Sequence, residues 1–233
     1  MAIQRSADAL LHDIGVNQAK VVLLVDRCGV GAEDGPTHHR INDLAILRSC
    51  PKMEIYSCSN NNLLDIADRI LNKERSGPIA IRIFKGPLID CSEDTLLHWP
   101  KGLFTHRNGN DLTILSHGRI LGECLKAAEL LKNDTINCNV IEIIKLHPID
   151  PSLLSFLQEK GPVIIVEEHA NNGSVGTNIG AIWNSTTPIK HLYITNQLTP
   201  HGDFIWQWQQ NGLDAKSIYN SCKYFLKEIK EEK

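Results

Sequence analysis

A short loop near the N-terminus concentrates residues that could bind a polar anion. Arg27, Asp34, His38 and His39 all fall in the segment DRCGVGAEDGPTHHR, directly after an apolar run at 21–25. An arginine can bind a phosphate, a carboxylate accepts hydrogen bonds from hydroxyl groups, and a histidine can donate to a carbonyl oxygen. The glycines of the loop let a ligand approach the backbone closely. The pattern therefore predicts a site for a polar, anionic, carbonyl-bearing ligand.

A purely structural interpretation is also open. In it, His38 and His39 cap the next helix and pair with nearby carboxylates. We favour binding, because arginine, aspartate and histidine together at the end of a buried strand are typical of ligand sites in open α/β sheets. The helix that follows also directs free N–H groups and the positive end of its dipole toward the same place.

Apolar patterning predicts that helices and strands alternate along most of the chain. Strands are expected at 20–26, 53–59, 78–84, 112–118, 139–146, 162–169 and 189–195. Helices are expected at 3–15, 41–50, 61–77, 119–133, 151–161, 176–184 and 215–229. This alternation favours parallel sheets, and the loop at 26–40 then lies at the carboxyl edge of one of them.

The fold class that we predict is α/β, with two three-layer α/β/α units and mainly parallel sheets. The first unit, residues 1–88, is expected to be truncated at its N-terminus, because it starts on a helix and shows only three convincing strands. Residues 89–110 carry scattered proline, glycine and asparagine without a period, so we expect a linker or a small irregular hairpin there. Residues 111–233 are expected to form a complete second domain.

Composition narrows the classes of function. The formal charge of −3 gives no reason to expect a nucleic-acid partner, and no window has the length of a membrane span or the form of a signal peptide. The seven cysteines are an odd number without a C-x-x-C pair, which argues against disulfides and a zinc site. We expect a cytoplasmic protein with reduced thiols and no metal ligands of its own.

The loop also resembles a motif of a known enzyme family. DRCGVGAEDGPTHHR is similar to the DRxG-x-x-G-x-DGPTHHG segment of the 1-deoxy-D-xylulose-5-phosphate synthases, which belong to the transketolase superfamily. Four other segments resemble that family in the same order along the chain: IQRSADALLHDI at 3–14, GPIAIRIFKG at 77–86, VIIVEEHANNGSVG at 163–176 and HGDFIWQWQQNGLDAKSI at 201–218. The resemblance covers essentially the whole chain and implies a pyrimidine-binding domain followed by a transketolase C-terminal domain.

The reaction implied by the resemblance joins pyruvate to glyceraldehyde 3-phosphate through thiamine diphosphate, with loss of carbon dioxide, on a route to isoprenoid precursors. The matching loop would serve the acceptor aldehyde. Arg27 and Arg82 would bind its phosphate, and Asp34 would bind its hydroxyl groups. His38 would act as the catalytic residue that hydrogen-bonds the carbonyl oxygen as charge develops there.

Two further substrate-binding residues are implied, and two positions depart from the family pattern. His39 completes the histidine pair, and Lys85 stands where the family often has a second arginine, so a forked contact becomes a point charge. Arg40 replaces the glycine that usually follows the histidines, which places a long cation beside the loop. The lysine at 85 would weaken binding there, and Arg40 indicates relaxed constraint or a changed substrate.

The cofactor elements of the family have no counterpart in this sequence. The resemblance places the diphosphate and its Mg²⁺ in an N-terminal domain with a GDG-type motif, which is missing here. The glutamate that activates the aminopyrimidine ring lies upstream of the segment at 3–14. We therefore expect the chain alone to bind neither thiamine diphosphate nor Mg²⁺ and to be inactive.

A partner is expected for the same reason. The chain would form a homodimer, or a hetero-oligomer with a chain that supplies the thiamine-diphosphate domain, and its other ligands would be small-molecule substrates. A split enzyme, a truncated gene and a mis-assigned start all remain open. The alternatives are a β-type subunit of a split transketolase or 2-oxoacid dehydrogenase and, from a different class, a non-catalytic dimerisation or regulatory remnant.

Overall fold

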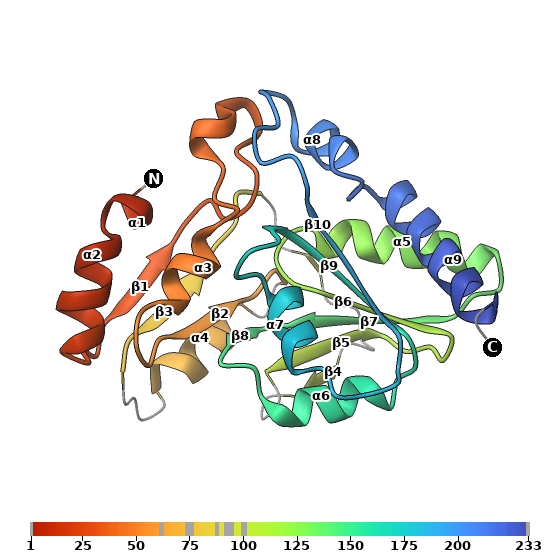
Figure 1. The fold of residues 1–233 in the computed structure, drawn as a ribbon, viewed down its shortest axis with the longest axis horizontal. Coiled ribbons are helices and arrows are strands. Elements are labelled where there is room, and N and C mark those ends of the chain that lie inside the picture. Colours follow the sequence, from red (N-terminus) through yellow and green to blue (C-terminus); the bar gives the residue numbers. More distant parts are fainter. Residues whose placement is uncertain are drawn as a thin grey trace.

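The structure, a computed structural model, describes residues 2–60, 63–72, 77–86, 89–90, 96–98 and 102–231. Two sheets form its centre (Figure 1). The first has the strand order β1-β3-β2-β8 and the second the order β10-β9-β6-β7-β5-β4. Both sheets are mainly parallel, and the fold is the predicted α/β class.

The elements alternate as the apolar pattern predicted. The strands are β1 (Val22–Val25), β2 (Glu54–Ser57), β3 (Ile79–Arg82), β4 (Leu96–His98), β5 (Leu103–Arg107), β6 (Leu112–Ser116), β7 (Cys138–Ile143), β8 (Lys145–His147), β9 (Val163–Ala170) and β10 (Ile189–Ile194). The helices are α1 (Ala2–Arg5), α2 (Ala7–Ala9), the π-helix η1 (Leu10–Val16), the 3₁₀ turns η2 (Ala32–Asp34) and η3 (Pro36–His38), α3 (Asp43–Arg48), α4 (Leu63–Asn72), α5 (Leu121–Asn133), α6 (Pro151–Gln158), α7 (Val175–Ile182), α8 (Phe204–Gln210) and α9 (Ala215–Glu231).

Helices cover both faces of the second sheet because its strands alternate their apolar side chains between the two. Ile114 of β6 packs into a core cluster that contains residues of α5 and α9, whereas its neighbour Leu115 packs into a cluster with residues of α6 and α7. The second cluster also contains Ile55 and Ala80 of the first sheet and Leu47 of α3. This second cluster is therefore shared by the two sheets.

One predicted strand contributes to both sheets. The sequence predicts one strand at 139–146, but the chain divides it at Ile144 into β7 and β8. β7 lies within the second sheet, and β8 pairs antiparallel with β2 of the first. The pattern could not show this division, because the apolar run continues across it from Ile143 and Ile144 to Leu146.

Two strands and one helix, β4, β5 and α8, lie where the apolar pattern shows no clear period. β4 and β5 form an antiparallel pair inside the stretch 89–110, and β5 pairs with β7 of the second sheet. α8 follows Asp203, whose side chain accepts a hydrogen bond from the N–H of Trp206 and so caps the helix. The division of the chain into domains at 1–88 and 111–233 stays a prediction. Among the described residues, no helix has both the length and the apolar character to cross a membrane.

Candidate functional site

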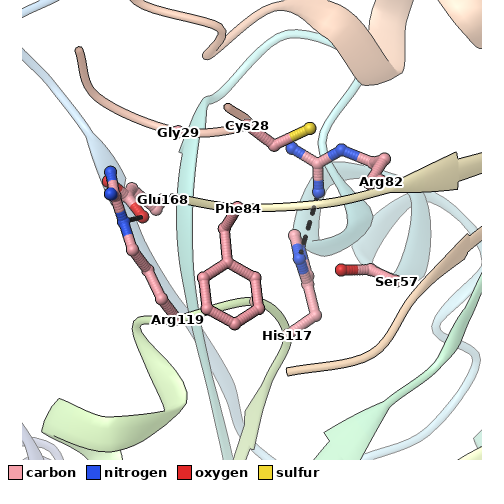
Figure 2. A pocket seen from close by; sticks show the side chains of 9 residues that line it. Cys28, Gly29, Ser57, Arg82, Phe84, His117, Arg119 and Glu168 are labelled. Carbon is pink, nitrogen blue, oxygen red and sulfur yellow. Dashed lines mark hydrogen bonds and ion pairs between the residues drawn. The ribbon is translucent and has the colours of Figure 1, made fainter. Parts of the chain in front are cut away.

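The carboxyl ends of strands from both sheets converge on one place. Figure 2 shows the side chains that line a small cavity there. Its volume is about 10 Å³, which is room for roughly one water molecule. Its lining comes from the ends of β1, β2, β3, β6 and β9 and the residues just after them: Cys28, Gly29, Ser57, Arg82, Phe84, His117, Gly118, Arg119 and Glu168. The predicted loop at 26–40 begins beside this cavity. Open α/β sheets bind ligands at such carboxyl edges.

The loop holds an unusual backbone path. Arg27 and Ala32 both have positive φ values, 53° and 49°, in the left-handed region that non-glycine residues rarely adopt. Gly29 (φ 98°) approaches the second sheet so closely that a Cβ on it would lie 2.5 Å from the carboxyl carbon of Glu168. Gly35 (φ 71°) packs against the ring of His201 in the same way. Strained backbone of this kind is concentrated at functional sites.

Three charged side chains of the predicted site, Arg27, Asp34 and Lys85, stand on the solvent side of this loop. Together with Glu33 they form the exposed cluster. Arg27 Nη1 lies 3.7 Å from Oδ2 of Asp34, and Lys85 Nζ lies 3.9 Å from Oε2 of Glu33. All four side chains are between 42% and 69% exposed. The two cations thus lie against adjacent carboxylates, and neither pair is within hydrogen-bond distance. His38 is also exposed, and its Nδ1 lies 3.0 Å from the hydroxyl of Thr37.

The two histidines of the pair have different surroundings. His39 is buried; its Nδ1 accepts a hydrogen bond from the N–H of Gly31 at 2.6 Å, and its Nε2 donates to the carbonyl of Thr199 at 2.9 Å. Both ring nitrogens are therefore committed to the backbone, which favours a structural role for His39 over the predicted contact with substrate. Neither histidine caps α3, whose N-cap position is Asn42.

Arg82 is buried in an ion pair instead of facing solvent. Its Nε and Nη2 donate to Asp43 at 2.7 and 3.0 Å, and its Nη1 lies 3.3 Å from Nδ1 of His117. Burial alone would raise the pKa of Asp43, but the charge and hydrogen bonds of Arg82 outweigh it and hold that pKa below its ordinary value. Burial raises the pKa of the neighbouring Cys28 thiol. This geometry favours a positioning role for Arg82 over the predicted phosphate contact.

Arg40 pairs with Asp26 at the start of the loop. Its Nη1 donates to Oδ1 of Asp26 at 2.7 Å and also to the carbonyl oxygen of Asp26. Its backbone pairs with Gly29 in an isolated antiparallel bridge, which closes the base of the loop. The cation that replaces the glycine of the family pattern therefore ties the two ends of the loop together.

A buried carboxylate lies behind the cavity. Glu167 accepts hydrogen bonds from Nε2 of His117, from Nε2 of His191 and from the N–H groups of Val175 and Gly176 at the start of α7. Burial would raise the pKa of Glu167, but the two histidines outweigh it and hold the pKa well below its ordinary value. This group links the cavity wall to α7 and β10.

His169 lies two residues further along β9 and is fully buried. Its Nε2 accepts from the N–H of Leu44, and its Nδ1 donates to the carbonyl of Ala170. Because burial disfavours the charged ring, the pKa of His169 is lowered. The residue thus joins β9 to the first turn of α3 in its neutral form.

Three residues that sequence reasoning missed hold the loop in place. Glu168 accepts from the N–H of Val30, and Arg119 donates to the carbonyl of the same residue. The side-chain amide of Gln207 in α8 likewise accepts a hydrogen bond from the N–H of Ala32 and donates one to the carbonyl of Ala32. Two features of the sequence could have pointed to these residues: the adjacent glutamates at 167–168 inside an apolar strand, and an arginine at the start of a helix.

No three His, Cys, Asp or Glu side chains in the described part of the chain are grouped so that they could hold a metal ion. The cations of the exposed cluster suit an anionic ligand, and its carboxylates suit hydroxyl groups. The arrangement can therefore bind a small phosphorylated polyol or aldehyde, with His38 free to donate to a further oxygen.

Comparison with known proteins gives two family matches. Residues 3–88 match the family described as the transketolase pyrimidine binding domain, and residues 102–218 match the transketolase C-terminal domain. Similar curated proteins include the 1-deoxy-D-xylulose-5-phosphate synthases of Carboxydothermus hydrogenoformans and Parabacteroides distasonis, each 32% identical to this chain. The alignments cover 97% and 95% of this chain but 37% and 36% of those relatives. The chain therefore spans a little over a third of their length.

Solved structures of similar fold include a split gene transketolase, described as an inactive beta4 tetramer, with a TM-score of 0.77 and 21% identity. The superposition covers 97% of this chain and 73% of that one. Transketolase from Campylobacter jejuni superimposes with a TM-score of 0.74 and 20% identity, over 95% of this chain and 33% of the other. At these identities the two structures support the fold.

Proposed function

The chain belongs to the thiamine-diphosphate-dependent transketolase family, and from this premise we propose that it supplies the acceptor-substrate side of a 1-deoxy-D-xylulose-5-phosphate synthase-like site. The donor would be pyruvate and the acceptor glyceraldehyde 3-phosphate, in a transfer reaction that leads toward isoprenoid precursors. The chain would work only together with a polypeptide that carries the rest of the site.

The observation that carries this proposal is the exposed cluster on the loop. Arg27 and Lys85 are cations held loosely against Asp34 and Glu33, at 3.7 and 3.9 Å, so their N–H groups are free to bind a phosphate. Asp34 remains available to accept from a hydroxyl group of the aldehyde. The strained backbone at Arg27 supports the same assignment, because it aims a side chain at the cost of local stability.

We assign the chemical contact to His38. Its ring is exposed at the end of η3, and an imidazole N–H there can donate to the acceptor carbonyl oxygen as negative charge gathers on it. Arg82 and His39 would not contact the substrate. Arg82 holds Asp43 and the cavity-lining His117, and His39 holds the fold of the loop.

Thiamine diphosphate would carry the two-carbon unit when bound, and the curated relatives extend well beyond the third of their length that this chain matches. The proposal therefore leaves the cofactor's diphosphate to another polypeptide region, and no step assigned here depends on it. The chain would form a homodimer, or a hetero-oligomer with a separate subunit that carries this region.

A β-type subunit of a split transketolase is the second candidate. It is favoured by one comparison, in which this chain covers 73% of a split gene transketolase, against 33% of the Campylobacter jejuni enzyme. The two candidates differ in the acceptor and in the gene arrangement but not in the role of the loop.

Mixing tests the proposal directly. The purified chain is combined with a polypeptide that carries the part of the synthases not matched here, and is incubated with pyruvate, glyceraldehyde 3-phosphate, thiamine diphosphate and Mg²⁺. We expect 1-deoxy-D-xylulose 5-phosphate to form only in the mixture. Product formation by the chain alone, or calorimetric binding of thiamine diphosphate to it at micromolar affinity, would overturn the division of labour.

A further inference from the structure

The strongest unassigned feature is the buried pair of Arg119 and Glu168 beside the cavity (Figure 2). Arg119 Nε donates to Glu168 Oε2 at 2.9 Å, and both side chains are only 7% exposed. The two residues come from different elements: Arg119 precedes α5, and Glu168 lies in β9. A buried pair of this kind is costly to desolvate, so its other hydrogen bonds indicate what it holds.

Those hydrogen bonds reach both segments that carry the exposed cations. Glu168 Oε1 accepts from the N–H of Val30 at 2.9 Å, and Arg119 Nη2 donates to the carbonyl of Val30 at the same distance. Arg119 Nη1 also donates to the carbonyl of Lys85 at 3.2 Å. Val30 lies three residues after Arg27. The pair therefore connects the backbone near Arg27 with the backbone of Lys85 itself.

An aromatic ring fixes the plane of this arginine. The guanidinium carbon of Arg119 lies 3.7 Å from the centroid of the Phe204 ring in α8, and Lys85 Nζ lies 5.9 Å from the same centroid. Stacking holds the planar fork in one orientation, which a lysine could not reproduce. Each of the three nitrogens of Arg119 already donates within the protein, and these bonds use four of its five N–H groups, so most of its donors hold protein groups.

We infer that Arg119, together with Glu168, is a positioning residue that sets the relation between Arg27 and Lys85 and so determines selectivity for a phosphorylated acceptor. The inference rests on the proposed function, because it assumes that those two cations bind the phosphate. Two cations that meet one phosphate group need a fixed separation, and here a single guanidinium holds both of their segments. If the guanidinium of Arg119 no longer held both segments, Arg27 and Lys85 would still be present, but the distance between them would no longer be fixed.

Arg119→Lys is the direct test in the full chain, because it keeps the charge and removes the fork. The probe is glycerol 3-phosphate, titrated by calorimetry, with glycerol as the unphosphorylated control. Arg107→Lys serves as the matched variant, because Arg107 pairs with exposed Glu129 away from the loop. Hydrogen exchange of the peptide that contains Val30 is measured in parallel, since that amide donates to Glu168.

We expect Arg119→Lys to weaken glycerol 3-phosphate binding about tenfold, and to speed exchange at Val30, while Arg107→Lys changes neither. Phe204→Leu leaves every hydrogen bond of Arg119 in place and removes only the ring, and it should give a smaller loss of affinity in the same direction. Wild-type affinity in folded Arg119→Lys would overturn the inference and leave the proposed function standing. Equal affinity of wild type and Arg27→Ala would overturn the proposed function, and the inference with it.

Discussion

Nη1 of Arg27 lies 3.7 Å from Oδ2 of Asp34, with both side chains about half exposed, whereas Arg82 meets Asp43 at 2.7 Å with both side chains buried. The two arginines were assigned the same role on the sequence. Their surroundings differ so much that substitution should affect different properties of the protein.

Replacing each arginine by alanine tests this difference. Arg27→Ala should change the free energy of unfolding by less than about 1 kcal/mol, because exposed ion pairs contribute little. Arg82→Ala should cost about 3–5 kcal/mol, because it leaves the carboxylate of Asp43 buried without a partner. Urea denaturation followed by circular dichroism measures both values. Equal losses in the two variants would show that the buried pair has no special structural role.

The histidine pair gives a second comparison. His39→Ala should lower the free energy of unfolding by about 1–3 kcal/mol, because Gly31 loses its acceptor and Thr199 its donor. His38→Ala should leave stability unchanged and lower turnover in the reconstituted enzyme about 100-fold, the typical cost of losing one donor to a developing oxyanion. Melting temperature and product formation are measured side by side. Normal turnover in folded His38→Ala would remove His38 from the chemistry.

Gln207 provides a test of how the loop is held. Gln207→Leu should destabilise the protein by about 1–3 kcal/mol, because the N–H and carbonyl of Ala32 lose their buried partner. Gln209 is exposed in the same helix, so Gln209→Leu is the matched control and should have little effect. Thermal unfolding of the two variants decides the matter. A large loss of stability in Gln209→Leu as well would show that any such change in α8 destabilises the protein, and that the hydrogen bonds to Ala32 are not the cause.

His169 predicts a dependence of stability on pH. Because burial lowers its pKa in the folded chain, the unfolded chain binds a proton first as the pH falls below the ordinary value of about 6.5. Stability from this group is therefore complete above that pH and declines below it. His147 also has a lowered pKa and contributes in the same direction. His169→Gln should flatten the decline between about pH 7 and 5, as measured by urea titrations at several pH values, and an unchanged slope would show that His169 does not contribute.

The sequence was sufficient for the fold class because buried strands and amphipathic helices have distinct periods. It also placed Arg27, Asp34 and His38 on one exposed loop, since all three lie within thirteen residues after β1. It could not separate Arg27 from Arg82, because burial depends on Asp43 and His117, which lie 39 and 35 residues away from Arg82 in the chain. Arg119, Glu168 and Gln207 were missed for the same reason. Each contacts the loop from a distant element, and no local spacing records such a contact.

Acceptor selectivity in the reconstituted enzyme tests the central claim most directly. The quantity is the ratio of kcat/KM for glyceraldehyde 3-phosphate to kcat/KM for glyceraldehyde, measured for wild type and for Arg27→Ala. Because a charge-assisted phosphate contact contributes about 1.5–3 kcal/mol, the ratio should fall about 10- to 100-fold in the variant, chiefly through the KM for the phosphorylated aldehyde. An unchanged ratio would contradict the assignment of this loop to the acceptor phosphate.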